Sequence, residues 1–183
     1  SINPDVGRPF DVEVLGSILV FPGFEDREGS PAHIGINAVT GGGPMPPQVP
    51  VVYVAGTCMN CGKTSAACRL IRQLTRRGLA VGACKLTGVA LRRDALQMRD
   101  YGAKWAVSFT DAGIVSTSST NAVGVARALL GHLVQAGAEV VVAELGDGIV
   151  GEYGVAQILS ERDLRNRQTI IVLCANDPVG AWG

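Results

Sequence analysis

The stretch VVYVAGTCMNCGKTSAACRL, residues 51–70, decides the fold of this chain. It opens with residues 51–55, a short apolar run rich in β-branched side chains, which predicts a buried strand. It leads into a predicted helix over residues 63–77, whose apolar side chains recur at three- and four-residue spacing: Ala67, Leu70, Ile71 and Leu74. A glycine-rich turn joins the strand to the helix. This order is typical of one βα unit in an open α/β sheet.

The turn itself, GTCMNCGKT at residues 56–64, has the composition of a cradle for phosphate groups. Glycines let backbone N–H groups fold around phosphate oxygens, and the start of a helix adds positive potential. A lysine at position 63 reaches the β and γ phosphates, and the hydroxyl at position 64 ligates magnesium. A plainer interpretation, a helix start with a solvent-exposed lysine, leaves the coincidence of strand, glycines and helix unexplained. We predict nucleotide binding by Gly56, Thr57, Asn60, Cys61, Gly62, Lys63, Thr64 and Ser65.

One spacing in this loop departs from the common phosphate-loop pattern. That pattern has a glycine five residues before Gly62, but Thr57 stands there and Gly56 comes one residue earlier. The loop is therefore one residue longer than usual.

Beyond the first helix, short apolar runs alternate with helical periods, which predicts βαβ units around a mainly parallel sheet. Strands are predicted at residues 79–85, 105–109, 139–144 and 169–175. Helices are predicted at 95–101, from Thr120 or Asn121 to 136, and at 155–162. We therefore expect a three-layer α/β fold of the P-loop NTPase type.

The residues before this sheet have a different character. Residues 1–40 contain two apolar, β-favouring runs, Val12–Phe21 and His33–Val39, and predict a small β-rich segment. Residues 41–50 combine glycines with prolines, which interrupt helix and sheet, and predict a linker. The nucleotide-binding domain then occupies residues 51–183.

The composition favours a compact globular protein with a small ligand. Apolar residues make up 47% of the chain and charged residues 17%, and 16 basic side chains balance 16 acidic ones. Because no net charge favours nucleic acid or an anionic membrane, a small-molecule substrate is expected. Short apolar runs and the lack of a signal-peptide pattern favour a cytoplasmic location. Five cysteines, an odd number, favour reduced thiols.

The longer loop GTCMNCGKT resembles that of dethiobiotin synthetase, an ATP-dependent carboxylation enzyme whose loop also begins Gly-Thr and ends Gly-Lys-Thr. Three further segments resemble that family in register: VGACKLTG at 81–88, RRDALQ at 92–97 and VVVAELGDG at 140–148. The resemblance covers about residues 51–175. It implies ATP and Mg²⁺ as ligands, and phosphoryl transfer to a carboxylate or carbamate on a small substrate.

The resemblance also implies roles for individual residues. It implies that Lys63 and Lys85 are catalytic lysines, which lie around the phosphates and the reacting carboxyl group. Thr64, Asp94 and Glu144 become magnesium ligands. A hydroxyl and one or two carboxylates suit this hard cation, and lysines offset the charge that builds up in phosphoryl transfer.

Several of these positions have alternatives. Asp147 follows Glu144 by three residues and is a rival carboxylate, while Asp94 follows two arginines with which it can pair on the surface. Cys58 and Asn60 stand where the family has acidic loop residues, so its diamine-type substrate is not carried over. Cys58 and Cys61 form a CxxC, which metal binding, redox chemistry or simple fit to a tight loop would each explain. A disulfide there would distort the cradle and act as an oxidation switch.

Two functional hypotheses follow. One is an enzyme that activates a small substrate held near Lys85 and the glycine-rich loop at 146–151. The other is a nucleotide-dependent switch or cofactor-delivery NTPase, which makes a homodimer the expected assembly. The segment ELGDGIVGEYG at 144–154 also resembles proteins in which a dethiobiotin-synthetase-like domain follows an N-terminal domain. That arrangement implies a longer protein, whose further strand and helix would hold the base-specific contacts.

Overall fold

The computed structural model describes Arg8 and residues 10–21, 23–39, 49–89, 91–166 and 168–182. The chain divides into two compact units, Ser1–His33 and Ile34–Gly183. Most of the predicted linker, residues 41–48, lies outside the described residues. The larger unit holds all the predicted nucleotide-binding elements.

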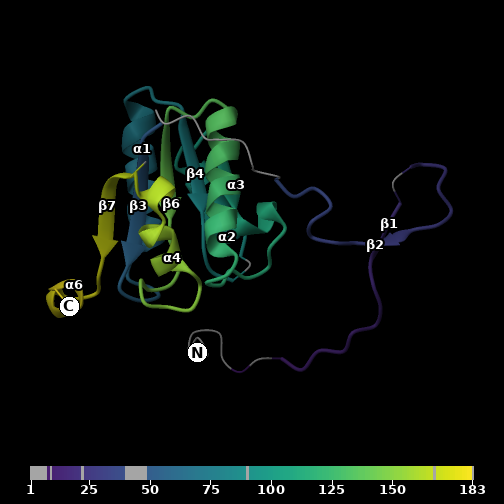
Figure 1. Cartoon of the computed structure of the whole chain (residues 1–183). Coiled ribbons are helices and arrows are strands. Elements are labelled where there is room, and N and C mark those ends of the chain that lie inside the picture. The colour runs from purple at the N-terminus through teal and green to yellow at the C-terminus, as the bar shows by residue number, and fades with distance from the viewer. Residues whose placement is uncertain are drawn as a thin grey trace. The chain divides into compact units, whose positions relative to one another are not determined.

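The larger unit is built on a five-stranded sheet with the strand order β5-β4-β6-β3-β7 (Figure 1). Every neighbouring pair in this sheet is parallel. The strands are β3 (Val51–Gly56), β4 (Val81–Lys85), β5 (Trp105–Ser108), β6 (Val140–Glu144) and β7 (Gln168–Cys174). The helices are α1 (Lys63–Arg76), α2 (Arg93–Asp100), α3 (Ala122–Gln135), α4 (Val155–Ser160), α5 (Arg162–Arg165), α6 (Pro178–Trp182) and the 3-10 helix η2 (Phe109–Ala112). The predicted mainly parallel α/β sheet is confirmed.

Helices cover both faces of the sheet, because successive side chains of a strand point to opposite sides. One hydrophobic core joins α3 and α4 to Tyr53 and Ala143 of the central strands. A second core joins α1 and α2 to Val54 and Val142. Figure 1 shows α3 and α4 together on one side of the strands. The three predicted layers are therefore present.

The predicted helix at 155–162 is divided in the structure. Glu161 has extended backbone angles, φ −70° and ψ 121°, so α4 ends before it and α5 begins after it. The break allows Leu164 of α5 to enter the same core as α4. Burial of the Leu164 side chain accounts for the break between α4 and α5, and the periodicity of apolar residues alone does not predict such a break.

The predicted small β-rich segment is present in the small unit as a two-stranded sheet. Among its described residues, the strands are β1 (Leu19–Val20) and β2 (Ser30–Pro31), which pair antiparallel. The rest of the apolar run from Val12 to Phe21 is outside a strand, because a strand needs a hydrogen-bonded neighbour. The second β-favouring run, His33–Val39, contains no strand: its residues 34–37 form a turn and belong to the larger unit.

The parallel register brings the ends of three strands to one edge of the sheet, where ligands bind in open α/β folds. β3 ends at Gly56, β4 at Lys85 and β6 at Glu144. Glu144 is in register with Lys85 on one side and with Val54 on the other. Residues from separate sequence motifs therefore meet beside the loop that follows β3.

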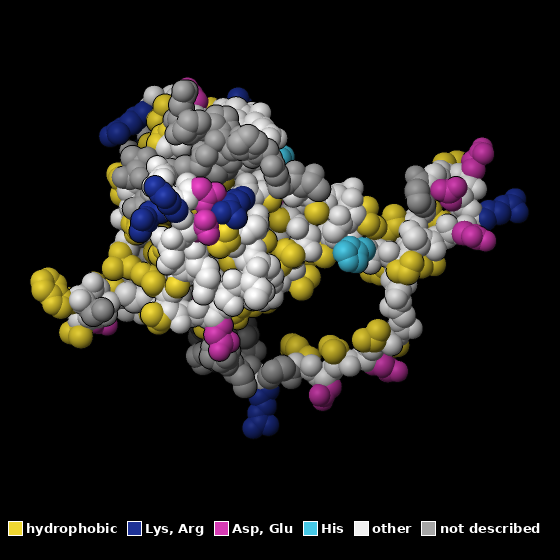
Figure 2. All heavy atoms as spheres, viewed as in Figure 1, with side chains coloured by type: hydrophobic (Ala, Val, Ile, Leu, Met, Phe, Trp, Pro, Cys, Tyr) yellow, Lys and Arg dark blue, Asp and Glu magenta, His cyan; other side chains and the backbone are white. Residues whose placement is uncertain are grey.

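Charged side chains of both signs are interspersed on the face of the molecule seen in Figure 2. Arg127 of α3 pairs with Glu161 at 3.0 Å and with Asp163 at 2.9 Å, which ties α5 to α3.

Across the part of the chain that the structure describes, no helix is both long and apolar enough to cross a membrane.

Candidate nucleotide-binding site

The phosphate loop, residues 56–64, has the backbone conformation of an anion cradle. Asn60 and Gly62 both have positive φ angles, 59° and 89°, so the chain turns sharply before the helix. Gly62 precedes the first residue of α1 and no side chain caps that helix. The first backbone N–H groups of α1 are thus left for a ligand, as anion binding at a helix N-terminus requires.

The first glycine of the loop lies where a larger residue would collide with its neighbours. A Cβ atom added at Gly56 would lie 2.3 Å from Cys61 Sγ and 2.8 Å from Lys63 Cδ. The loop therefore closes tightly over the end of β3, and glycine at this position is a packing requirement.

Replacing Gly56 by alanine is expected to destabilise the protein by about 1–3 kcal/mol, because the new methyl group overpacks the loop. The matched control is Gly124→Ala on α3, where an added Cβ meets nothing within 4 Å. That change is expected to stabilise the protein by about 0.5–1 kcal/mol, since alanine is the better helix former. Urea unfolding of both variants measures the two effects, and equal stability of the Gly56 variant and wild type would contradict the packing argument.

Lys63 lies inside the loop with only 6% of its surface exposed. Its Nζ atom donates a hydrogen bond to the Cys58 carbonyl oxygen at 2.6 Å and lies 3.6 Å from Cys61 Sγ. The ammonium group thus sits in the curve of the loop, bound by the loop's own backbone. The plainer interpretation of a solvent-exposed lysine is wrong.

Thr64 and Glu144 meet beside this lysine. The Thr64 hydroxyl donates to Glu144 Oε1 at 2.9 Å, although the two residues are 80 positions apart in the sequence. Glu144 is 1% exposed, and its second oxygen, Oε2, is buried without a hydrogen-bond partner. Burial raises the pKa of this carboxyl group, while the positive charge of Lys85 opposes the rise. A buried carboxylate oxygen without a partner is costly in a folded protein, so this atom is suited to binding a cation.

The second lysine and the third carboxylate form an ion pair next to Glu144. Lys85 at the end of β4 bonds to Asp94 in the first turn of α2, and its Nζ lies 3.9 Å from Glu144 Oε1. Asp94 is 4% exposed. Asp94 was also a candidate for a surface pair with its neighbouring arginines. The Arg93 Nε atom lies 3.9 Å from Asp94 Oδ1, but the Lys85 ammonium is much closer, so Lys85 is the main partner of Asp94.

The rival carboxylate Asp147 has a different position. A Cβ atom on Gly151 would lie 2.3 Å from Asp147 Oδ2, so this side chain faces its own loop. That loop packs on the phosphate loop: Ile149 donates its N–H to the Gly56 carbonyl at 3.0 Å, and Gly148 approaches the Thr57 carbonyl. Glu144 is therefore the carboxylate that contacts the Thr64 hydroxyl.

Two buried threonines near the site were missed by sequence reasoning. Thr87 donates to the Gly146 carbonyl at 2.9 Å, and the Thr117 hydroxyl accepts the Gly88 N–H at 2.8 Å. Both join the segment after β4 to other loops at the same edge of the sheet. The segment VGACKLTG was noted for its lysine, but only the long-range hydrogen bonds show what its threonine does.

The residues present fit a magnesium ion held together with phosphate. Among the described residues, no group of three or more His, Cys, Asp or Glu side chains converges on one point. Thr64, Glu144 and Asp94 therefore supply too few ligands for a cage made of protein alone. Magnesium in nucleotide sites takes one or two carboxylates with substrate phosphates and waters completing its shell, which matches this set.

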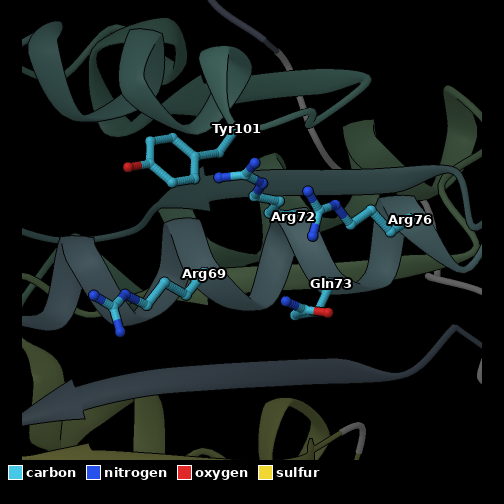
Figure 3. A pocket seen from close by; sticks show the side chains of 5 residues that line it. All are labelled: Arg69, Arg72, Gln73, Arg76 and Tyr101. Atoms are coloured by element: carbon cyan, nitrogen blue, oxygen red, sulfur yellow. The ribbon is translucent and has the colours of Figure 1, made fainter.

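A separate hollow lies farther along α1. It is lined by Arg69, Arg72, Gln73 and Arg76 of α1 and by Tyr101, which follows α2 (Figure 3). Arg69 comes six residues after Lys63, which is about 9 Å along the helix axis. None of the predicted site residues lines this hollow.

Comparison with solved structures identifies the fold. The chain is similar to the signal recognition particle 54 kDa protein from Aeropyrum pernix K1 in complex with GDP, at 22% identity and a TM-score of 0.50, over 76% of this chain and 31% of that one. It is also similar to the signal recognition particle receptor FtsY from Elizabethkingia anophelis, at 17% identity and a TM-score of 0.48, over 76% and 44% of the two chains. The chain thus spans less than half the length of these structures. No family model and no curated protein matches the sequence.

The parallel sheet and the glycine-rich loop between β3 and α1 define an α/β fold of the P-loop NTPase type. The first structure named above shares this fold at low sequence identity. These comparisons do not show the dethiobiotin synthetase family.

Proposed function

We propose that this chain binds a magnesium nucleoside triphosphate at residues 56–65 and transfers its terminal phosphoryl group. One observation carries the proposal most directly: the Thr64 hydroxyl contacts Glu144 Oε1, and Glu144 Oε2 is buried without a partner. Thr64 is the second residue of α1, and the positive charge of Lys63 opposes the rise that burial causes in the pKa of the Glu144 carboxyl group. A hydroxyl, a carboxylate and a lysine in this arrangement suit a phosphate-bound cation.

Binding would rearrange the loop's internal hydrogen bonds. The Lys63 ammonium now donates to the Cys58 carbonyl, and a phosphate oxygen would compete for this donor. Charge-assisted hydrogen bonds to phosphate are stronger than those to a neutral carbonyl, so the exchange favours the ligand. Bound magnesium would neutralise charge on the phosphates during transfer.

The acceptor side of the proposed reaction lies at Lys85. Its ammonium is close to both Asp94 and Glu144, and its Cε lies beside Gly146 at the start of the 146–151 loop. A small carboxylate or carbamate bound there would be attracted by this lysine and would face the terminal phosphate. ATP is the nucleotide that the resemblance to dethiobiotin synthetase implies.

Titration calorimetry with ATP and with GTP, each with and without Mg²⁺, tests this proposal. We expect magnesium-dependent binding of a nucleoside triphosphate, with ATP preferred. Absence of binding to both nucleotides at millimolar concentration would contradict it. Turnover that appears only when small carboxylates or amines are added with bicarbonate would support the ligase reaction, and turnover without any co-substrate would count against it.

A nucleotide-dependent switch is the second candidate, and two hydrogen bonds in the structure favour it. The 146–151 loop is bonded to the phosphate loop through the Ile149 N–H and to the segment after β4 through Thr87. A change at the phosphate loop would therefore reach two neighbouring segments, residues 146–151 and the residues that follow β4. Light scattering of the apo, diphosphate and triphosphate states is expected to show a nucleotide-dependent dimer in this case, and a monomer in every state would exclude that dimer.

A further inference from the structure

The phosphate loop carries two thiols that nucleotide binding does not require. Cys58 and Cys61 lie at the two ends of the turn formed by Met59 and Asn60, and all five cysteines of the chain are free. We propose that Cys58 and Cys61 are a reversible oxidation site, and that a disulfide between them closes the phosphate loop to nucleotide. The loss of nucleotide binding rests on the proposed function, whereas formation of the disulfide does not depend on it.

The turn places the two cysteines at a separation that a disulfide can span. Asn60 occupies the third position of the turn with φ 59°, a conformation that asparagine tolerates better than most residues. The first and fourth Cα atoms of such a turn lie less than about 7 Å apart, and disulfides join Cα atoms about 4.4–6.8 Å apart. Cys61 Sγ already lies 3.0 Å from the Cys58 carbonyl oxygen. A rotation of the side chains and a tightening of the turn bring the sulfurs together.

The two thiols differ in access, which sets the order of reaction. Cys58 is exposed to solvent, and the Asn176 amide lies 3.4 Å from its sulfur. Cys61 is buried, with 8% of its surface exposed. Cys58 is thus the thiol that an oxidant meets first, and Cys61 is the neighbour that resolves the intermediate.

The remaining thiols are poor competitors. Cys68 and Cys84 are buried in the two cores, and burial raises the pKa of Cys68 to about 11 and that of Cys84 further. A thiol that stays protonated is a weak nucleophile. Cys174 at the end of β7 is the nearest rival, because its carbonyl accepts the Thr57 N–H at 3.0 Å, but burial raises the pKa of its thiol as well.

A Cys58–Cys61 bond would remove the space that phosphates need. In the reduced loop, Cys61 Sγ is packed against Gly56 and lies 3.6 Å from the Lys63 ammonium. Drawing this sulfur toward Cys58 pulls the residue before Gly62 across the turn, and the backbone N–H groups of residues 60–63 lose their common direction. The cradle depends on that shared direction, so triphosphate affinity falls.

The chemistry balances as thiol–disulfide exchange with a low-molecular-weight disulfide as oxidant. The Cys58 thiolate attacks one sulfur of the oxidant, whose S–S bond breaks and releases one thiol. The Cys61 thiolate then attacks the Cys58 sulfur and releases the second thiol. Two electrons pass from the cysteine pair to the oxidant, and a dithiol reductant reverses both steps.

The experiment treats the whole chain with oxidised glutathione, then maps disulfides by mass spectrometry and measures nucleoside triphosphate affinity by calorimetry before and after adding a dithiol reductant. We expect a Cys58–Cys61 bond, a loss of affinity of at least tenfold, and full recovery on reduction. Cys58→Ser should resist oxidation, so its own nucleotide affinity should be the same before and after treatment with oxidised glutathione. Cys174→Ser is the matched control and should remain as sensitive as wild type.

Each part of the proposal has its own contrary result. A map that shows no Cys58–Cys61 bond, or a bond to Cys174, overturns the oxidation site. A mapped Cys58–Cys61 bond with unchanged affinity overturns the closing of the loop. If the reduced protein binds no nucleotide, the proposed function fails, whereas the disulfide map still decides whether the oxidation site exists.

Discussion

Replacing Lys63 by alanine is expected to lower the affinity for a magnesium nucleoside triphosphate by about a hundredfold or more. Lys63 is buried in the loop, and its ammonium is the cationic side chain in the curve of that loop. A charge-assisted hydrogen bond contributes about 1.5–3 kcal/mol, and about 1.4 kcal/mol corresponds to a tenfold change in affinity. Loss of contacts to two phosphate groups therefore removes most of the binding. Titration calorimetry at fixed Mg²⁺ measures the change.

The control for this variant is Lys104→Ala. Lys104 Nζ lies over the ring of Trp105, 4.7 Å from its centroid. Lys104 is at the starts of β4 and β5, since its N–H bonds to the Val81 carbonyl, whereas the candidate site is at the opposite ends of the strands. Its removal is expected to leave nucleotide affinity unchanged. Near wild-type affinity of the Lys63 variant, with a normal unfolding curve, would show that the loop is not the phosphate site.

The second large effect is expected for Glu144→Gln, which should abolish the magnesium dependence of nucleotide binding. Glutamine keeps the shape of the side chain and can still accept the Thr64 hydroxyl bond, but it lacks the charge that a hard cation requires. Calorimetry with and without Mg²⁺ is expected to give the same affinity for this variant. Retention of the full magnesium effect would exclude Glu144 as a ligand.

The same variant should be at least as stable as wild type when no ligand is bound. Burial raises the pKa of Glu144 in the folded state above its ordinary value. Between the unfolded and the folded pKa, the native state therefore holds more protons than the unfolded state. The free energy of unfolding of the wild type then falls as the pH rises through that window. Glutamine does not titrate, so the variant lacks this fall. Its thermal unfolding midpoint should be higher than that of wild type at neutral pH, and the two midpoints should become equal below the unfolded pKa.

Glu139→Gln is the matched control for both measurements. Glu139 is exposed, and its carboxylate accepts the Ala80 N–H at 2.7 Å, a bond that a glutamine oxygen can also accept. The magnesium dependence of nucleotide binding should equal that of wild type, and the unfolding midpoint of this variant is the reference for Glu144→Gln. A lower unfolding midpoint for Glu144→Gln than for this control would contradict the prediction that the buried Glu144 carboxylate destabilises the ligand-free protein.

Local patterns were sufficient for the central elements of the fold. The strand at 51–55, the glycine-rich turn and the helix from Lys63 each have a strong periodicity or a required residue type, and the structure has β3, the loop and α1 at these positions. The small unit shows the opposite case. Its apolar run from Val12 to Phe21 has the composition of a strand, but strand formation depends on a neighbouring chain segment, which composition does not specify.

Within the candidate site, the sequence by itself determined which residues are suited to phosphate and magnesium: Lys63 and Thr64 follow from their place between a strand and a helix start. Only the tertiary structure decided how the distant residues combine. The parallel register brings Glu144 to Thr64 and places Lys85 between Asp94 and Glu144. The same packing turned Asp147 toward its own loop and left Glu144 Oε2 without a partner. Motif spacing describes a few consecutive residues, whereas strand pairing and burial fix distances between side chains that the sequence separates by tens of positions.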